Sequence, residues 1–237
     1  MVNRDEEARR LRKIYEARHY DVDPAYCDVN PVNLQRVQSM ERAALRALAQ
    51  AGLSEHIGEI DVLDFGCGNG KWFGRWLAWG AMPERLVGVD ARPEAITLAR
   101  RRFPGSLLQP SEPDQLPFED ERFDVVSQNG AFSSILDAEL RAVCADELNR
   151  VLRPGGLLLW CDLAYDNPRN PDVKAVKARE LRALFRHLEP VRIDRIVLAP
   201  PLARLVVPTS WLAARILEYG LPFLRTHLHA VLRKPTR

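Results

Sequence analysis

Long uninterrupted apolar runs are missing from this chain of 237 residues. Its most apolar region, 196–224, is broken by prolines and charged side chains, among them Pro200, Pro208 and Glu218. A membrane-spanning helix needs about 20 predominantly apolar residues, so the sequence predicts none. The charged first residues also lack the apolar core of a signal peptide, and we therefore expect a cytoplasmic protein.

The chain also has few cysteines and a small net charge. The four cysteines have no C-x-x-C spacing, which argues against a zinc site or a disulfide framework and favours reduced, mostly buried thiols. A net charge of +2 is far from the clustered basic excess of a nucleic-acid-binding surface, so we expect no nucleic-acid partner. With 46% hydrophobic and 28% charged residues, the composition is that of an ordinary globular protein.

Apolar segments of strand length alternate with segments of helical periodicity over most of the chain. This alternation predicts an α/β fold, in which a mostly parallel sheet has helices on both faces. The expected strands are 60–65, 85–90, 106–109, 123–128, 156–162, 190–198 and 226–233; the expected helices are 3–19, 33–51, 70–80, 93–102, 137–151, 174–187 and one that begins at Thr209 or Ser210.

Three alternating glycines follow the first predicted strand. Residues 61–70 read Asp-Val-Leu-Asp-Phe-Gly-Cys-Gly-Asn-Gly, which gives the pattern D-x-G-x-G-x-G from Asp64 onward. A dinucleotide fingerprint, G-x-G-x-x-G, would need its last glycine where the chain has Lys71 or Phe73. Glycines let the backbone turn tightly and approach a ligand closely. The loop therefore predicts a nucleoside-binding turn that is not the dinucleotide type.

The second predicted strand also ends in an acid, Asp90. In an open α/β sheet the ligand lies beyond the carboxyl ends of the strands, so this side chain is expected beside the glycine loop. A carboxylate there can accept both hydroxyls of a ribose. It can also cap the helix that begins at Pro93, and the two roles are compatible.

Two further motifs complete a series. Residues 109–126 contain Leu-Pro-Phe followed by Phe-Asp-Val-Val, and residues 152–159 read Leu-Arg-Pro-Gly-Gly-Leu-Leu-Leu. With the glycine loop and Asp90, in this order over residues 60–162, they resemble the class I S-adenosylmethionine-dependent methyltransferases of the type 11 group. The resemblance implies a Rossmann-like sheet of seven strands with an antiparallel last strand, an N-terminal helical cap and an insert between strands 6 and 7.

The resemblance also implies one domain, 1–237, made of an N-terminal cap (1–52), a cofactor-binding core (60–163) and a lid insert (199–224). Glu112 takes the place of the family's aspartate near the adenine, with Asp114 as a second candidate. The residues expected to bind S-adenosylmethionine are Asp64, Gly66, Cys67, Gly68, Gly70, Asp90, Ala91, Arg92, Glu112, Pro113, Gln128 and Asn129.

The sequence gives weaker indications of the residues that bind the acceptor or act as a base. Methyl transfer from a sulfonium is an in-line displacement, so the protein mainly positions the acceptor, and a hydroxyl acceptor also needs a base. The antiparallel last strand would start at the ligand edge, which makes His227 the leading candidate base and Asp162 the second catalytic candidate. His19 is an alternative contact. The pair Asp166-Asn167 after the fifth strand leaves a metal-dependent reaction open, although we expect no metal.

The insert carries Arg204, Arg215 and Arg225 among apolar residues. As a lid over the acceptor, it could place these arginines on a phosphate or carboxylate. As a structural cap, it would only cover the edge of the sheet. We favour the lid, because inserts at the ligand edge are where such folds vary their substrates.

These observations predict an enzyme that transfers a methyl group to a small-molecule or glycan-type acceptor in biosynthesis, with oxygen favoured as the methylated atom. Two alternatives stay open. One is a catalytically silent protein that binds S-adenosylmethionine as a sensor or partner subunit, and the other is a methyltransferase for a lipid-linked or quinone acceptor at a membrane surface. The sequence does not distinguish a monomer from a homodimer.

Overall fold

The computed structural model describes residues 7, 9–11, 13–14, 26–27, 29–168 and 170–236. Their strands form one seven-stranded sheet in the order β3-β2-β1-β4-β5-β7-β6. The strands β1 to β5 pair in parallel, whereas β7 is antiparallel to β5 and β6. The predicted fold class is thus confirmed. The strands are β1 (Val62–Phe65), β2 (Leu86–Asp90), β3 (Leu107–Pro110), β4 (Phe123–Asn129), β5 (Leu152–Leu163), β6 (Glu189–Leu198) and β7 (Arg225–Arg233).

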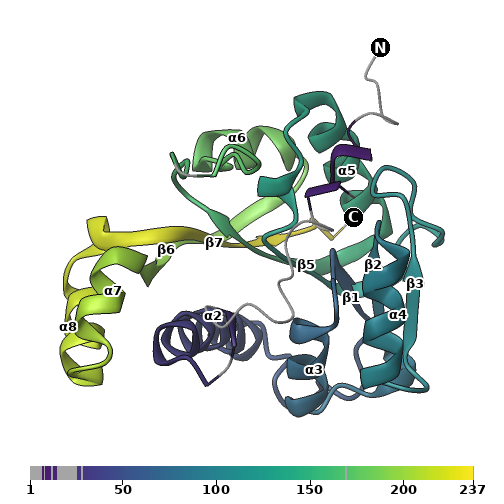
Figure 1. Ribbon diagram of the computed structural model, residues 1–237. Helices are drawn as coiled ribbons and strands as arrows, with labels where there is room; N and C mark the ends of the chain where they lie inside the picture. The colour runs from purple at the N-terminus through teal and green to yellow at the C-terminus, as the bar shows by residue number, and fades with distance from the viewer. Residues whose placement is uncertain are drawn as a thin grey trace.

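Helices cover both faces of the sheet (Figure 1). The helices α5 and α6 lie on one face, over a core that includes Trp160 and Phe185, and α2, α3 and α4 lie on the other, over a core that includes Phe73 and Trp76. The helices are α2 (Pro31–Gln50), α3 (Lys71–Ala78), α4 (Pro93–Arg102), α5 (Ala138–Val151), α6 (Ala178–Leu184), α7 (Pro200–Val206) and α8 (Trp211–Gly220), with short 3-10 turns η2 (Pro83–Arg85), η3 (Phe132–Ser134) and η4 (Pro222–Leu224).

Two helical predictions need correction. The helix expected over 174–187 is shorter, because the backbone N–H groups of Lys174 and Ala175 donate to Ser133 and Asp166 instead of to a helix. The insert holds two helices rather than one. The missed helix, α7, begins at a Pro-Pro pair, and proline suits the first turn of a helix because the N–H groups there have no partner within the helix.

The antiparallel last strand brings the start of β7 to the carboxyl ends of the parallel strands. In the observed register His227 lies opposite Leu163, at the end of β5, and opposite Ile196 on β6. The helices α7 and α8 follow β6 and lie beyond this end of the sheet (Figure 1). Among the described residues, no helix has both the length and the apolar composition needed to cross a bilayer.

Candidate active site

A cavity of about 1030 Å³ lies at the carboxyl ends of β1, β2, β4 and β5. It extends from the glycine loop at one end to α2, α7 and the start of β7 at the other. The position is the one expected for a ligand of an open α/β sheet. The predicted site residues that line it are Asp64, Gly66, Cys67, Gly68, Asp90, Ala91, Arg92, Pro113, Asn129, Asp162 and His227.

The glycine loop follows β1 directly, with Gly66 and Gly68 in the left-handed region at φ 70° and 56°. A Cβ on Gly66 would lie 2.7 Å from the Cβ of Ala131, so only glycine lets this loop pass the segment after β4. The backbone N–H of Cys67 donates to Val89 on β2 over 2.9 Å. The loop is therefore fixed between two strand ends, with its backbone exposed to the cavity.

Asp64 presents an unusual carboxylate to the cavity. Its side chain is buried, and its Oδ1 accepts the hydroxyl of Ser127 over 3.1 Å, while Ser127 in turn accepts the indole N–H of Trp76. Its Oδ2 is buried and has no hydrogen-bond partner among the residues that the structure describes. Burial, offset partly by Ser127 and reinforced by the charge of Asp90, raises the pKa of Asp64 to about 7.

Asp90 is fully hydrogen-bonded. Its Oδ2 accepts the backbone N–H of Gly68 over 2.9 Å and an Nη2–H of Arg92 over 3.1 Å. Its Oδ1 accepts the backbone N–H and the Nε–H of Arg92 over 3.0 and 2.8 Å. A carboxylate has about four acceptor positions, so a ribose can bind here only where the Arg92 side chain releases some of them.

Three predicted cofactor residues are not among those that line the cavity. Gly70 has φ 84° and precedes α3, where a Cβ would lie 2.7 Å from the ring of Phe103. Gln128 is buried, accepts the N–H of Ala131 and donates to the carbonyl of Cys161, so it supports the loop after β4. Glu112 lies in a turn whose neighbours, Ser111 and Pro113, face the cavity instead.

Asp162 also lines the cavity, but both of its oxygens accept hydrogen bonds. Its Oδ2 accepts the N–H of Ser133 over 3.0 Å and its Oδ1 that of Leu163 over 2.8 Å. Burial, partly offset by these bonds, raises the pKa of Asp162. Its observed contacts are those of a residue that holds the segment after β4 against the end of β5.

His227 lies beside a cation that the sequence did not single out. Burial, with a contribution from the positive charge of Arg36 on α2, lowers the pKa of His227 to about 3. Arg36 lines the same cavity, donates from Nε and Nη2 to Asn33 and faces the ring of Tyr26 at 5.8 Å. One feature of the sequence could have indicated Arg36. It follows Asn33, a buried polar residue of the amphipathic helix α2, by three positions, so the two residues share one side of the helix.

Of the three insert arginines, only Arg204 lines the cavity. Arg225 donates to the carbonyls of Arg195, Glu218 and Tyr219, so it holds the insert together. Leu11 and Tyr26, from the N-terminal segment, also line the cavity. His19 lies outside the described residues.

The sequence did not reveal a second arginine either, Arg141 on α5, which holds a segment that lines the cavity. Its side chain is 2% exposed and donates to the carbonyls of Ile135 and Lys174 and to the carboxylate of Glu180. Ile135 lines the cavity, and Lys174 precedes α6. The guanidinium therefore joins two segments that only the fold brings together.

We expect Arg141→Leu to lower the free energy of unfolding by about 3 kcal/mol, because it leaves buried acceptors and a carboxylate without their donor. Urea denaturation followed by circular dichroism measures this change. The matched control, Arg101→Leu, alters an exposed arginine on α4 and should stay within about 0.5 kcal/mol. A loss below about 1 kcal/mol for Arg141→Leu would contradict the role given to this side chain.

The described residues contain no group of three or more histidines, cysteines, aspartates or glutamates placed to hold a metal ion. Three of the four cysteines, Cys67, Cys144 and Cys161, are buried free thiols, and Cys27 is exposed. Burial raises the pKa of Cys161 far above its usual range. This thiol is therefore unsuited to act as a nucleophile.

Comparison with known proteins connects this geometry to a family. Residues 63–160 match the family model described as a methyltransferase domain. The match includes the glycine loop, Asp90 and the end of β4, that is, the part of the cavity where the cofactor is expected.

Two curated relatives match over part of their length. The chain is 32% identical over 148 residues to malonyl-[acyl-carrier protein] O-methyltransferase of Erwinia billingiae, which covers 57% of each chain. It is 33% identical over 147 residues to phthiotriol/phenolphthiotriol dimycocerosates methyltransferase of Mycobacterium tuberculosis, which covers 60% of this chain and 53% of that one. The chain therefore spans a little over half the length of these relatives.

A solved structure matches over nearly the whole chain. It is the 1,6-didemethyltoxoflavin-N1-methyltransferase of Burkholderia thailandensis with bound 1,6-didemethyltoxoflavin and S-adenosylhomocysteine. The TM-score is 0.67, with 99% of this chain and 92% of that chain covered, and the identity of 22% makes this a likeness of fold. By its motifs, its sheet and the family match over residues 63–160, the chain contains a methyltransferase domain like that of the class I S-adenosylmethionine-dependent methyltransferases, whose cofactor is S-adenosylmethionine.

Proposed function

We propose that the chain transfers the methyl group of S-adenosylmethionine to a negatively charged oxygen, such as a carboxylate, on a small acceptor. The observation that carries the proposal is a single cavity that joins the glycine loop to a second end containing Arg36 and His227. A methyl donor and an acceptor must meet in one space, with the reacting atoms in line and water excluded.

The residues at the first end fit the cofactor. The unpartnered Oδ2 of Asp64 suits the α-ammonium group of the methionine part, and the carboxylate of Asp90 suits the ribose hydroxyls. The glycine loop, at Gly66 and Gly68, leaves room for close approach. When bound, the cofactor supplies an electrophilic methyl group on a sulfonium; the protein holds and orients it.

The residues at the second end favour an acceptor that is already charged. A general base acts best when its pKa lies near the operating pH, and the pKa of His227 is about 3. Burial raises the pKa of Asp162, but both of its oxygens accept hydrogen bonds from backbone N–H groups. A carboxylate, or an oxygen of similar acidity, needs no base and would be attracted by Arg36.

The names of the relatives support two parts of this proposal. The relative named malonyl-[acyl-carrier protein] O-methyltransferase methylates oxygen, by its name, which supports oxygen here. The relative named for phthiotriol/phenolphthiotriol dimycocerosates supports a second candidate, an acceptor with a lipid part. The apolar surface of the insert also favours that candidate. Acids with short and long acyl chains would separate the two, because a lipid part should lower KM.

We expect Asp90→Ala to weaken the binding of S-adenosylhomocysteine at least tenfold, because the ribose hydroxyls lose an acceptor that is 7% exposed in the structure. Isothermal titration calorimetry measures the dissociation constant. Arg92→Met is the matched control: it removes the side chain that competes for the same carboxylate, so the affinity should not fall.

An unchanged affinity in Asp90→Ala would contradict the cofactor placement. Calorimetry measures binding of the cofactor product and not methyl transfer, so a catalytically silent protein that binds the cofactor would give the same result. Turnover of any carboxylic acid, followed by transfer of a labelled methyl group, would exclude the silent alternative.

A further inference from the structure

The insert presents large apolar side chains to solvent. Leu205 on α7 is 73% exposed, Leu212 and Ile216 on α8 are 69% and 62% exposed, and Phe223 in η4 is 67% exposed. Scattered exposed apolar residues are normal, but α8 places Trp211, Leu212, Ile216 and Tyr219 on one exposed side, and a row of this kind marks an interaction site. The insert surface, as we name it, consists of Leu205, Trp211, Leu212, Ile216, Tyr219 and Phe223.

The rotation of α8 is fixed, so the exposure of its apolar side is not an accident of a loose helix. The single acid of α8, Glu218, is 3% exposed and points inward. It accepts hydrogen bonds from the hydroxyl of Ser39, from Gln35 over 2.7 Å and from the N–H of Val197 over 3.2 Å. A helix on a protein surface usually turns charge outward and apolar residues inward, and α8 does the reverse at these positions.

The charges that accompany the insert surface have one sign. Within residues 200–224 the charged side chains are Arg204, Arg215 and Glu218, and only the two arginines are exposed. Arg215 lies over the ring of Tyr219 at 5.9 Å, and its position on α8 is between Trp211 and Tyr219 in the exposed row. Apolar residues with tryptophan, tyrosine and arginine are the composition of segments that lie in the interface of an anionic bilayer.

The helix α7 contributes both to the cavity and to the insert surface. Pro200, Ala203 and Arg204 of α7 line the cavity, and Leu205, the next residue, belongs to the insert surface.

We propose that the insert surface docks the protein on a bilayer that contains anionic phospholipid. The side chains of α8 and η4 would enter the headgroup region, with Arg204 and Arg215 on lipid phosphates. The apolar residues outnumber the arginines, which favours a lipid surface over an acidic protein, where ionic contacts would dominate. This proposal concerns only the insert surface and does not depend on which acceptor binds in the cavity.

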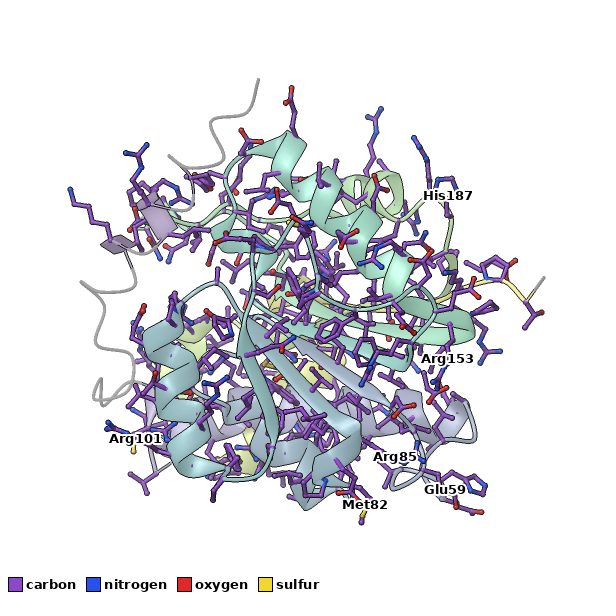
Figure 2. The ribbon with its side chains drawn as sticks, turned by 90° about the vertical axis from the view of Figure 1, so that its right-hand side faces the viewer. Glu59, Met82, Arg85, Arg101, Arg153 and His187 are labelled. Carbon is purple, nitrogen blue, oxygen red and sulfur yellow. The ribbon has the colours of Figure 1, made fainter. Side chains whose placement is uncertain are left out.

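Co-sedimentation with vesicles tests the proposal, using phosphatidylcholine alone and an equal mixture with phosphatidylglycerol. We expect the full chain to pellet with the mixture, and Leu212→Glu with Ile216→Glu to reduce the partition coefficient by about tenfold or more. Arg215→Gln should reduce the preference for the anionic vesicles by about fivefold. The matched control, Met82→Glu with Leu107→Glu, changes two residues that are 44% and 46% exposed elsewhere (Met82 is labelled in Figure 2) and should bind as the original chain does.

Each other outcome contradicts the proposal. Absence of pelleting with both vesicles would do so, and so would equal binding by the double variant once its circular dichroism spectrum shows that it is folded. A concentration-dependent dimer in analytical ultracentrifugation that the same double variant abolishes would assign the insert surface to a second copy of the chain. None of these measurements involves methyl transfer, so their failure and that of the proposed function are distinguishable.

Discussion

Binding of S-adenosylhomocysteine should strengthen about tenfold for each pH unit between about pH 5 and pH 7, and level off above that range. The pKa of Asp64 in the structure is about 7, mainly because the carboxylate is buried. Asp64 lines the cavity, its Oδ2 has no hydrogen-bond partner among the described residues, and we expect the cofactor's α-ammonium group at this carboxylate. Only the ionised carboxylate attracts that group, so the ligand must release a proton from Asp64 when it binds at lower pH. Calorimetry over this pH range measures the change.

The stability of the unliganded protein should depend on pH in the opposite direction. The ordinary pKa of an aspartate is 3.8, so between that value and about 7 the folded protein keeps a proton that the unfolded chain has lost. The free energy of unfolding therefore decreases as the pH rises through this window, and the loss is complete above it. The gap between the two pKa values corresponds to about 4 kcal/mol, which is an upper figure.

Asp64→Asn separates these effects. It keeps the shape of the side chain but cannot ionise, so the unliganded variant should be more stable than the original chain above about pH 7, and the decline with pH should diminish. The same change should weaken S-adenosylhomocysteine about a hundredfold at pH 8, because a buried charge-assisted bond is lost. Asp120→Asn, at a side chain that is 74% exposed, is the control and should alter neither measurement.

A flat affinity between pH 5 and pH 7 would exclude the ammonium contact for Asp64. The cofactor site as a whole would still be tested separately by Asp90→Ala, because that carboxylate contacts a different part of the ligand in the proposed placement. A stability that rises over this pH window in the original chain, but not in Asp64→Asn, would reverse the sign of the argument.

Local patterns were sufficient for the parts of the fold and site that depend on neighbours in sequence. The helix α4 begins and ends where its pattern predicts, at Pro93 and Arg102, and the acids at the ends of β1 and β2 line the cavity as expected. These features follow from strand ends, helix starts and glycine conformations, which a short segment determines by itself.

The acceptor end depends on contacts between distant segments, and the sequence could not reveal it. Arg36 reaches the cavity from α2, and Arg141 joins segments that lie before and after it in the chain. Gln128 shows the same dependence on distant contacts: its place at the end of β4 predicts a ligand contact, and in the structure its amide oxygen accepts the N–H of Ala131 in the loop that follows, while its amide nitrogen donates to the carbonyl of Cys161. The place of a residue in a predicted strand shows that it lies at the ligand edge of the sheet. The direction of its side chain depends on packing against distant segments, which the sequence does not show.

Arg36→Met should lower kcat/KM for a carboxylate acceptor about a hundredfold, mainly through KM, because the acceptor loses a charge-assisted contact in a partly enclosed cavity. Arg36→Lys keeps the charge and should restore part of the loss. S-adenosylhomocysteine should bind both variants as it binds the original chain, since its proposed contacts are Asp64 and Asp90, whereas the charge of Arg36 acts on His227. Initial rates and calorimetry provide these numbers.

A second readout of Arg36 needs no acceptor. Its charge contributes to the low pKa of His227, so the pKa of that imidazole should rise in Arg36→Met and stay low in Arg36→Lys, as followed by nuclear magnetic resonance of the histidine ring. An unchanged pKa would show that the guanidinium does not face His227. A raised pKa of His227 with an unchanged KM would show that Arg36 faces His227 but does not bind the acceptor. The proposed preference for a negatively charged oxygen would then have no positively charged side chain to explain it.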